Sequence, residues 1–130
     1  MKKLTILFIL LVSTVMFSSP SYAGWTKLGT SVDGTTIYVD LERIRKHDGY
    51  NYYWRLFDYL KPLHGDLSSK AYNQGDCKLF RIKRLSYSFH KEPMGLGTAD
   101  VQEPTKKNQA WKYPHPNSVD ERILKSVCSR

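Results

Sequence analysis

The sequence predicts an α+β fold: an antiparallel sheet of about five to six strands, with one C-terminal helix packed on a face and a single disulfide. Three observations predict it. Short runs rich in β-branched and aromatic residues, bounded by turn residues, fill the chain from Trp25 to His90. One amphipathic segment closes the chain, and it contains one of only two cysteines.

Residues 1–23 are predicted to be a secretory signal peptide. Lys2 and Lys3 precede an almost wholly apolar run, Leu4–Phe17, and small residues stand two apart at Ser21 and Ala23. The run is shorter than the ~20 apolar residues that a membrane span needs, so we expect no integral membrane segment after cleavage. Because the first cysteine is Cys77, none stands at the cleavage site to take a lipid. We expect residues 24–130 to form one domain, exported to the periplasm or the medium, that is not a lipoprotein.

The mature chain begins with a predicted hairpin. Asp33 and Gly34 lie between two strand-like runs, Trp25–Ser31 and Thr35–Asp40, and Asp-Gly in that place favours a tight turn. The next run, Leu41–Lys46, is long enough for one helical turn only. A second turn follows at His47-Asp48-Gly49.

Tyr50–Leu60 has the clearest strand pattern in the protein. At a period of two residues, aromatic side chains fall on both of its faces, so at most one face can be fully wet. One face carries Tyr50, Tyr52, Trp54, Leu56 and Leu60, and the other carries Asn51, Tyr53, Arg55, Phe57 and Tyr59.

Two further strands are predicted at Ser68–Asp76 and Lys78–His90, with Gly75 suited to a turn or bulge between them. In the second strand, Arg81 and Lys83 break the alternation by sharing a face with its apolar residues. A bulge would restore the alternation. Alternatively, the strand lies at an edge, where inward charges discourage pairing with another chain.

The segment Glu92–Asn117 is predicted to be a long loop, with Trp111 and Tyr113 returning to the sheet, because it holds four prolines and a polar middle. A capping box of Ser118 and Glu121 then opens a helix. Glu121 and Lys125 form an i, i+4 pair on its wet side. The apolar stripe of the helix comprises Val119, Ile123, Leu124, Val127 and Cys128.

Cys77 and Cys128 are predicted to form a disulfide. An exported chain with two cysteines allows only one pairing, and its compartment is oxidising. A metal pair or a reactive thiol lacks support, because the cysteines have no CxxC spacing and no histidine within four residues of either.

A further likeness rests on five stretches that span nearly the whole mature chain: YVD at Tyr38–Asp40, WRLFDYLKP at Trp54–Pro62, SSKAYNQGDCKLFRIKRLSYSF at Ser68–Phe89, MGLG at Met94–Gly97 and SVC at Ser126–Cys128. They resemble the surface adhesin protein E family of Gram-negative bacteria. The resemblance implies about six antiparallel strands, a C-terminal helix, the same disulfide and a non-enzymatic role.

The resemblance also implies partners. The named adhesin of the family binds vitronectin, laminin and plasminogen, largely through the strands around its first cysteine, which correspond here to about Pro62–Ser86. That adhesin is a lipoprotein, whereas this chain lacks the anchor cysteine.

Nothing in the sequence favours catalysis, so we expect no enzyme activity, no cofactor and no metal. The histidines are scattered, without HExxH or HxH spacing, and MGLG lacks the context of a phosphate loop. A hydrolase would need two carboxylates close together. No sequence spacing pairs any two of the candidates, which are Asp40, Asp58, Asp66 and Asp76.

The stretch Asp76–Lys91 is the predicted binding region. From Lys78 onward it has five cations and no acid, interleaved with aromatic residues. Three interpretations are open: a solvated strand face, a binding site for single-stranded nucleic acid, and a binding surface for acidic proteins or polyanionic glycans. Export argues against nucleic acid. The net charge of +8, which loses two positive charges with the signal peptide, favours the third.

We therefore predict a non-catalytic binding protein for host proteins or other acidic partners, with a homodimer as a further possibility. The alternative is a periplasmic structural or small-ligand-binding protein with no adhesive role. The candidate binding residues are Lys70, Tyr72, Lys78, Arg81, Lys83 and Arg84, with Tyr53 and Phe57 as an aromatic patch for a partner.

Overall fold

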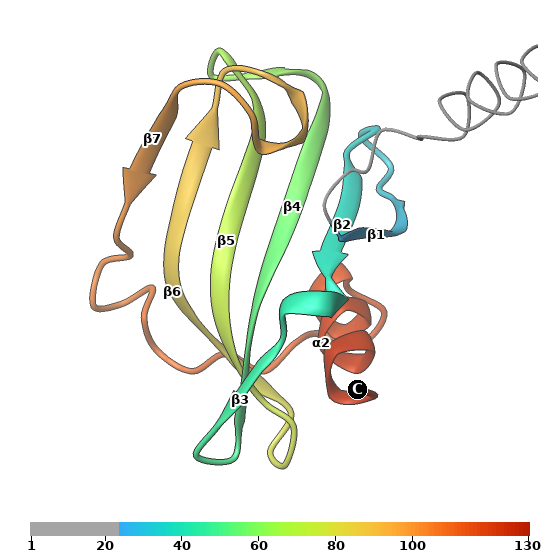
Figure 1. Ribbon diagram of the computed structural model, residues 1–130, viewed down its shortest axis with the longest axis vertical. Coiled ribbons are helices and arrows are strands. Elements are labelled where there is room, and N and C mark those ends of the chain that lie inside the picture. The colour runs from blue at the N-terminus through green and yellow to red at the C-terminus, as the bar shows by residue number, and fades with distance from the viewer. Residues whose placement is uncertain (1–23) are drawn as a thin grey trace, which may run out of the picture.

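A computed structural model describes residues 24–130 of the protein, and the predicted signal peptide lies outside the described residues (Figure 1). All paired strands run antiparallel in one seven-stranded sheet of order β1-β2-β4-β5-β6-β7, with β3 paired to β4. One α-helix, α2 (Val119–Cys128), follows the last strand. These features confirm the predicted α+β fold.

The predicted N-terminal hairpin is present as β1 (Trp25–Thr30) and β2 (Thr36–Asp40). The Asp33 carboxylate accepts hydrogen bonds from the Ser31 hydroxyl and the Thr35 N–H, which closes the turn. The predicted single helical turn is the 3-10 helix η1 (Leu41–Arg43). A three-residue strand, β3 (Arg45–His47), which the sequence did not predict, then pairs with the start of the next strand.

The centre of the sheet is built by β4 (Tyr50–Leu63), β5 (Asp66–Asp76) and β6 (Arg81–His90). The register between β5 and β6 shifts at Tyr72/Asn73, so that Leu85 has no partner on β5. This bulge puts Ile82 and Arg84 on the face that packs against α2, and Arg81 and Lys83 on the opposite, open face. The bulge is therefore the right alternative for the broken alternation. The edge alternative is wrong, because β7 (Ala99–Gln102) pairs with residues 87–90 of β6 and Lys112 bridges to Ile82 between Arg81 and Lys83.

Gly75 does not form a turn, which corrects the sequence prediction. It lies inside β5, and the turn occupies residues 77–80, so β6 begins at Arg81 rather than at Lys78. A Cβ atom on Gly75 would lie 2.9 Å from Leu124 Cδ1 and 3.2 Å from Tyr53 Cε1. The glycine is therefore required by the close approach of the helix.

The helix packs against the sheet as its apolar stripe predicted. Ile123, Leu124 and Val127 are buried, and they form one core with Ile37, Val39, Tyr53 and Ile82. The Ser118 hydroxyl caps the helix by accepting a hydrogen bond from the Glu121 N–H at 3.2 Å, and Glu121 pairs with Lys125 at 3.3 Å. In place of the reciprocal bond to Ser118, the Glu121 carboxylate accepts from the Asn117 N–H.

The predicted Cys77–Cys128 disulfide is present and joins the end of α2 to the turn after β5. Asn51 supports this junction from β4, since its side-chain amide donates to the Val127 carbonyl at 3.3 Å. The amide also lies 3.6 Å from Cys77 Sγ.

The predicted loop after β6 contains a 3-10 turn, η2 (Pro93–Gly95), and the short strand β7. Further on, Lys112 bridges to Ile82 through two backbone hydrogen bonds, so Trp111 does return to the sheet. Tyr113 remains 63% exposed.

Each face of the sheet is covered over only half its length. In Figure 1, α2 lies beside the ends of β2 and β4 that are close to β3, and the far ends of β4, β5 and β6 extend beyond it. On the open face, η2 folds over those far ends: the Met94 N–H donates to Asp58 Oδ1, and the Gly95 N–H donates to Ser68 Oγ. The two uncovered areas thus lie on opposite faces and at opposite ends of the sheet.

Candidate binding surface

The uncovered half of the open face carries a continuous group of aromatic and basic side chains. Its aromatic members come from β4, from β5 and from the segment that returns to the sheet after β7, while its cations come from β3, β5 and β6. We call this group the aromatic face: Tyr50, Tyr52, Trp54, Tyr72 and Trp111, with Arg45, Lys70, Arg81 and Lys83.

The rings of the aromatic face pack on one another. The Trp54 and Tyr72 ring centroids are 4.8 Å apart, because the two residues are direct partners in the β4–β5 register. Tyr52 lies 6.2 Å from Tyr72, and Tyr50 lies 5.5 Å from Trp111. These separations are those of favourable aromatic pairs, so the rings hold one another in fixed positions while remaining partly exposed.

Four cations lie over these rings. Arg81 and Lys83 approach the Trp111 ring at 4.3 and 4.9 Å from its centroid. Arg45 lies 5.2 Å from the Tyr52 centroid, and Lys70 lies 5.9 Å from that of Trp54. The distances are within the range of cation–π attraction, so the rings restrict the positions of these basic groups.

The charges of the aromatic face are not equally available. Arg81 forms an ion pair with Asp76 at 2.9 Å, and this hydrogen bond raises the pKa of the Arg81 guanidinium. Lys70 and Lys83 form no ion pair with any of the described residues. Arg45, which is exposed, forms none either. These three cations are therefore the groups that can meet an anion on a partner.

The predicted binding residues lie in four places: the aromatic face, the turn between β5 and β6, the opposite face of the sheet, and the core. Lys70, Tyr72, Arg81 and Lys83 lie together on the aromatic face. Lys78 is exposed in the turn between β5 and β6. Arg84 and Phe57 point to the other face of the sheet, where they line a hollow with Arg55.

Tyr53 does not belong to any surface patch, which corrects the prediction. It is fully buried beneath α2, next to Leu124 and Gly75. The prediction was wrong because the period-two pattern of β4 put Tyr53 and Phe57 on one face without showing that the helix covers only the first of them.

Five members of the aromatic face are not among the predicted binding residues: Tyr50, Tyr52, Trp54, Trp111 and Arg45. The shared face of Tyr50, Tyr52 and Trp54 was visible in the alternation of β4, but nothing in the sequence identified it as the uncovered face. Trp111 and Arg45 come from segments whose pairing with the sheet depends on tertiary contacts.

The titratable residues show no catalytic grouping within the described chain. His90 is buried, and its Nε2 lies 2.8 Å from the Ser88 hydroxyl. Across residues 24–130, no three histidine, cysteine, aspartate or glutamate side chains come close enough together to hold a metal ion. The helices in this part of the chain are too short or too polar to cross a membrane.

Comparisons with known proteins agree with this architecture. Two solved structures of protein E from Haemophilus influenzae superpose on the chain with TM-scores of 0.63 and 0.65, at 16% and 17% identity. The matches cover 86% and 85% of this chain, and 79% and 90% of those chains. No curated protein sequence matches the chain. A family model described as surface-adhesin protein E matches residues 25–129. The chain therefore belongs to the surface-adhesin protein E family.

Proposed function

We propose that this family member is an exported, non-catalytic binding protein whose aromatic face contacts an acidic surface on a partner, either a host protein or a polyanionic glycan. The observation that carries the proposal is the position of Lys70 and Lys83. Both lysines lie over aromatic rings, without a carboxylate partner among the described residues. Lys83 lies on the part of the sheet that α2 and η2 leave uncovered, and Lys70 lies at its border, with its aliphatic chain beside Gly95 of η2. Export rests on the signal peptide predicted at residues 1–23 and on membership of a surface-adhesin family.

The composition of the aromatic face supports binding rather than a solvated strand surface. Tyrosine, tryptophan and arginine are the residues most often found as hot spots in protein interfaces. Here they are held in place by ring packing, so less conformational entropy is lost when a partner binds. Simple solvation would not require five rings on a half-covered sheet face.

The charge of the protein supports an acidic partner. The formal net charge is +8, and opposite charge on a partner accelerates the encounter between two molecules. The family resemblance makes vitronectin, laminin and plasminogen the host proteins to test. Heparin serves as the polyanionic glycan. The alternative of a periplasmic structural role would leave the aromatic face without a partner.

The test is to reverse Lys70 and Lys83 together to glutamate and to measure binding to immobilised vitronectin and heparin. At low salt we expect association to slow by about tenfold or more, because electrostatic steering is lost. Binding of the parent should weaken as salt rises, since the screening length falls from ~10 Å at 0.1 M to ~3 Å at 1 M.

Reversal of Lys46 and Arg122 is the matched control. Both are exposed on the helix side of the sheet, so this variant changes the net charge equally without touching the aromatic face. Equal losses in the two variants would mean that total charge, not the aromatic face, attracts the partner. Unchanged binding by a folded Lys70/Lys83 variant would contradict the proposal.

A further inference from the structure

A second uncovered area lies on the helix side of the sheet, beyond the reach of α2. Its floor is the central strand β5, on which the small residues Ala71 and Ser69 face the helix side, and Ser69 and Lys70 line the hollow. Ala71 is flanked by Arg55 on β4 and Tyr87 on β6, and Ser69 is flanked by Phe57 and Phe89 in the next row. Large side chains on both outer strands therefore enclose a hollow of about 360 Å³ above a low central strand. We call it the arginine hollow.

Arg55 is the unusual residue of this hollow. It is only 6% exposed, and its Nε and Nη1 atoms have no hydrogen-bond partner. Its guanidinium lies 3.9 Å from the centroid of the Phe57 ring, and it forms no ion pair with any described residue. Burial, together with the nearby Arg84 cation, lowers the pKa of Arg55 to about 10, so the group is still protonated at neutral pH.

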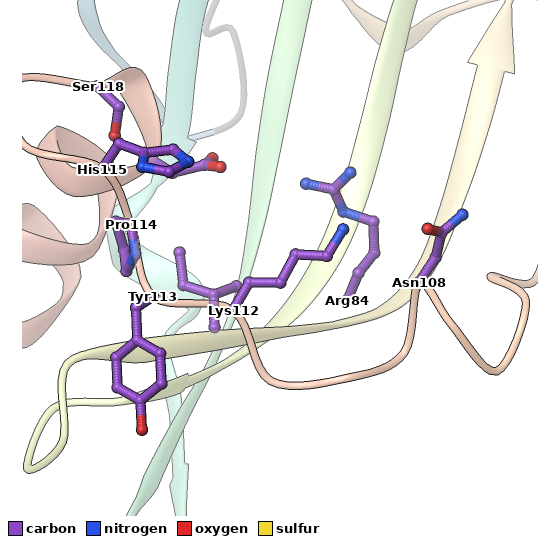
Figure 2. A pocket seen from close by; sticks show the side chains of 9 residues that line it. Arg84, Asn108, Lys112, Tyr113, Pro114, His115 and Ser118 are labelled. Carbon is purple, nitrogen blue, oxygen red and sulfur yellow. The ribbon is translucent and has the colours of Figure 1, made fainter.

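Two further cations face the same space. Arg84 on β6 has a buried Nε without a hydrogen-bond partner, and Lys112 lines the hollow from the segment before α2. Figure 2 draws the adjoining hollow of about 140 Å³, which Arg84 and Lys112 also line, and shows these two side chains extending toward each other. Asp120 lines the adjoining hollows of about 140 and 510 Å³, and the larger of these is also lined by Asp33, Arg55 and Arg84. The Asp120 carboxylate therefore partly opposes the lowering of the Arg55 pKa. Neither carboxylate lines the hollow between Arg55, Tyr87 and Phe89. The 360 Å³ hollow is thus lined by positive charge without a carboxylate.

Two nitrogens of a buried cation without hydrogen-bond partners are costly to the folded protein, and an anion that accepts from them would reduce that cost. Guanidinium groups suit planar oxyanions, which they bind through paired N–H donors. Phe57, Tyr87 and Phe89 line the same hollow, and the last two pack edge to face at 5.6 Å. The hollow therefore offers both positive charge and apolar rings from the side chains of β4 and β6 that enclose it.

We propose that the arginine hollow binds a small organic carboxylate, with the carboxylate on Arg55 and Arg84 and an apolar or aromatic body against Phe57, Tyr87 and Phe89. Lys112 at the rim draws the anion in. The site lies on the opposite side of the sheet from the aromatic face, and of the residues that line the hollow only Lys70 also belongs to that face.

Thermal unfolding and NMR titration with benzoate test this assignment, with benzyl alcohol as the neutral analogue and inorganic sulfate as the compact anion. Benzoate at ten times its Kd should raise the melting temperature by about 5 °C, since a ligand that binds only the folded state stabilises it. Amide shifts should cluster on β4, β5 and β6 around Ala71. Benzyl alcohol should give little effect, and sulfate should bind less tightly than benzoate.

Two variants locate the binding energy. Arg55→Met keeps the side-chain volume and removes the buried charge, so the free variant should melt at the parent temperature or above it while losing the benzoate response. Arg84→Gln should lower benzoate affinity about tenfold and decides the matter if Arg55→Met does not fold. Lys83→Gln, on the other face, is the control and should respond to benzoate as the parent does.

Several results would overturn the proposal. These are a parent that shows no response to benzoate at about 10 mM, an Arg55→Met or Arg84→Gln variant that binds as the parent does, and equal binding of benzyl alcohol. Sulfate binding as tight as that of benzoate would overturn the organic class of the ligand.

Discussion

Asp76 shows how one side chain holds together the turn that carries the disulfide. Its Oδ1 accepts the N–H groups of Lys78 and Leu79 at 3.0 and 3.1 Å, and its Oδ2 accepts Arg81 Nε at 2.9 Å. Burial alone would raise the pKa of this carboxyl, but the hydrogen bonds from Leu79, Arg81 and Lys78 outweigh it and hold the pKa below its usual value. The ionised form is therefore the one that the fold stabilises.

Asp76→Asn should destabilise the protein by about 2 kcal/mol at pH 7, because charge-assisted hydrogen bonds are lost. A carboxyl with a lowered pKa contributes stability above its ordinary value of 3.8 and loses it as pH falls through the folded-state pKa. The gap between parent and variant should therefore close between pH 4 and more acid conditions, as measured by urea unfolding. Asp100→Asn, at an exposed position, is the control. A gap that stays constant with pH would show that the charge of Asp76 is not involved.

Gly75→Ala should cost about 1 to 3 kcal/mol, because the new methyl group would meet Leu124, Tyr53 and the Asn51 carbonyl within 3.3 Å. Chemical denaturation measures the loss. Gly29→Ala on β1 is the matched control, because the atom that its Cβ would meet is the tip of the flexible Arg122 side chain. Similar losses of unfolding free energy at both sites would mean that Gly75 matters for its backbone conformation and not for the close contact between α2 and β5.

Helices and strands were predicted best where their sequence pattern was long. β4 and α2 show strong periodicity over ten residues or more, and both were predicted within a few residues of their ends. The short strands β3 and β7 are exposed and carry no alternation. They exist because an outer edge of β4 or β6 is available for pairing, and this cannot be deduced from three or four residues alone.

The bulge in β6 shows a different limit. The broken alternation at Arg81 and Lys83 was visible in the sequence, but a bulge and an edge strand explained it equally well. Only the partner on each side decides between them, and those partners lie at Tyr72/Asn73 and in β7. The sequence therefore located the irregularity without identifying its kind.

The disulfide should contribute about 4 kcal/mol by the chain-entropy model, since it closes a loop over a separation of 51 residues. Replacing Cys77 and Cys128 together by serine should lower the melting temperature markedly, which calorimetry measures. A reductant should lower the parent to the same value and leave the double variant unchanged. A double variant that melts with the parent would show that the bond contributes nothing to stability.

The positions of the candidate surfaces depend on which parts of the sheet α2 and η2 cover. The sequence does not predict which parts these are. Period two told which residues share a face of β4. It did not tell that α2 covers one half of one face and η2 the opposite half of the other. Four of the predicted residues lie on the aromatic face, whereas Arg84 and Phe57 lie in the arginine hollow and Tyr53 lies in the core. These assignments follow from how two short elements dock.

The Cys77–Cys128 bond also decides how the protein would respond to mechanical load. A tension applied before β1 and after Cys128 passes through this covalent link, so the chain between the two cysteines bears none of it. The load can pull strands β1 to β5 out of the sheet, which lengthens the loaded chain by at most ~3.5 Å for each residue from 24 to 76. Arg81, Lys83 and Trp111 lie inside the shielded loop. A reduced protein, in contrast, would extend through them.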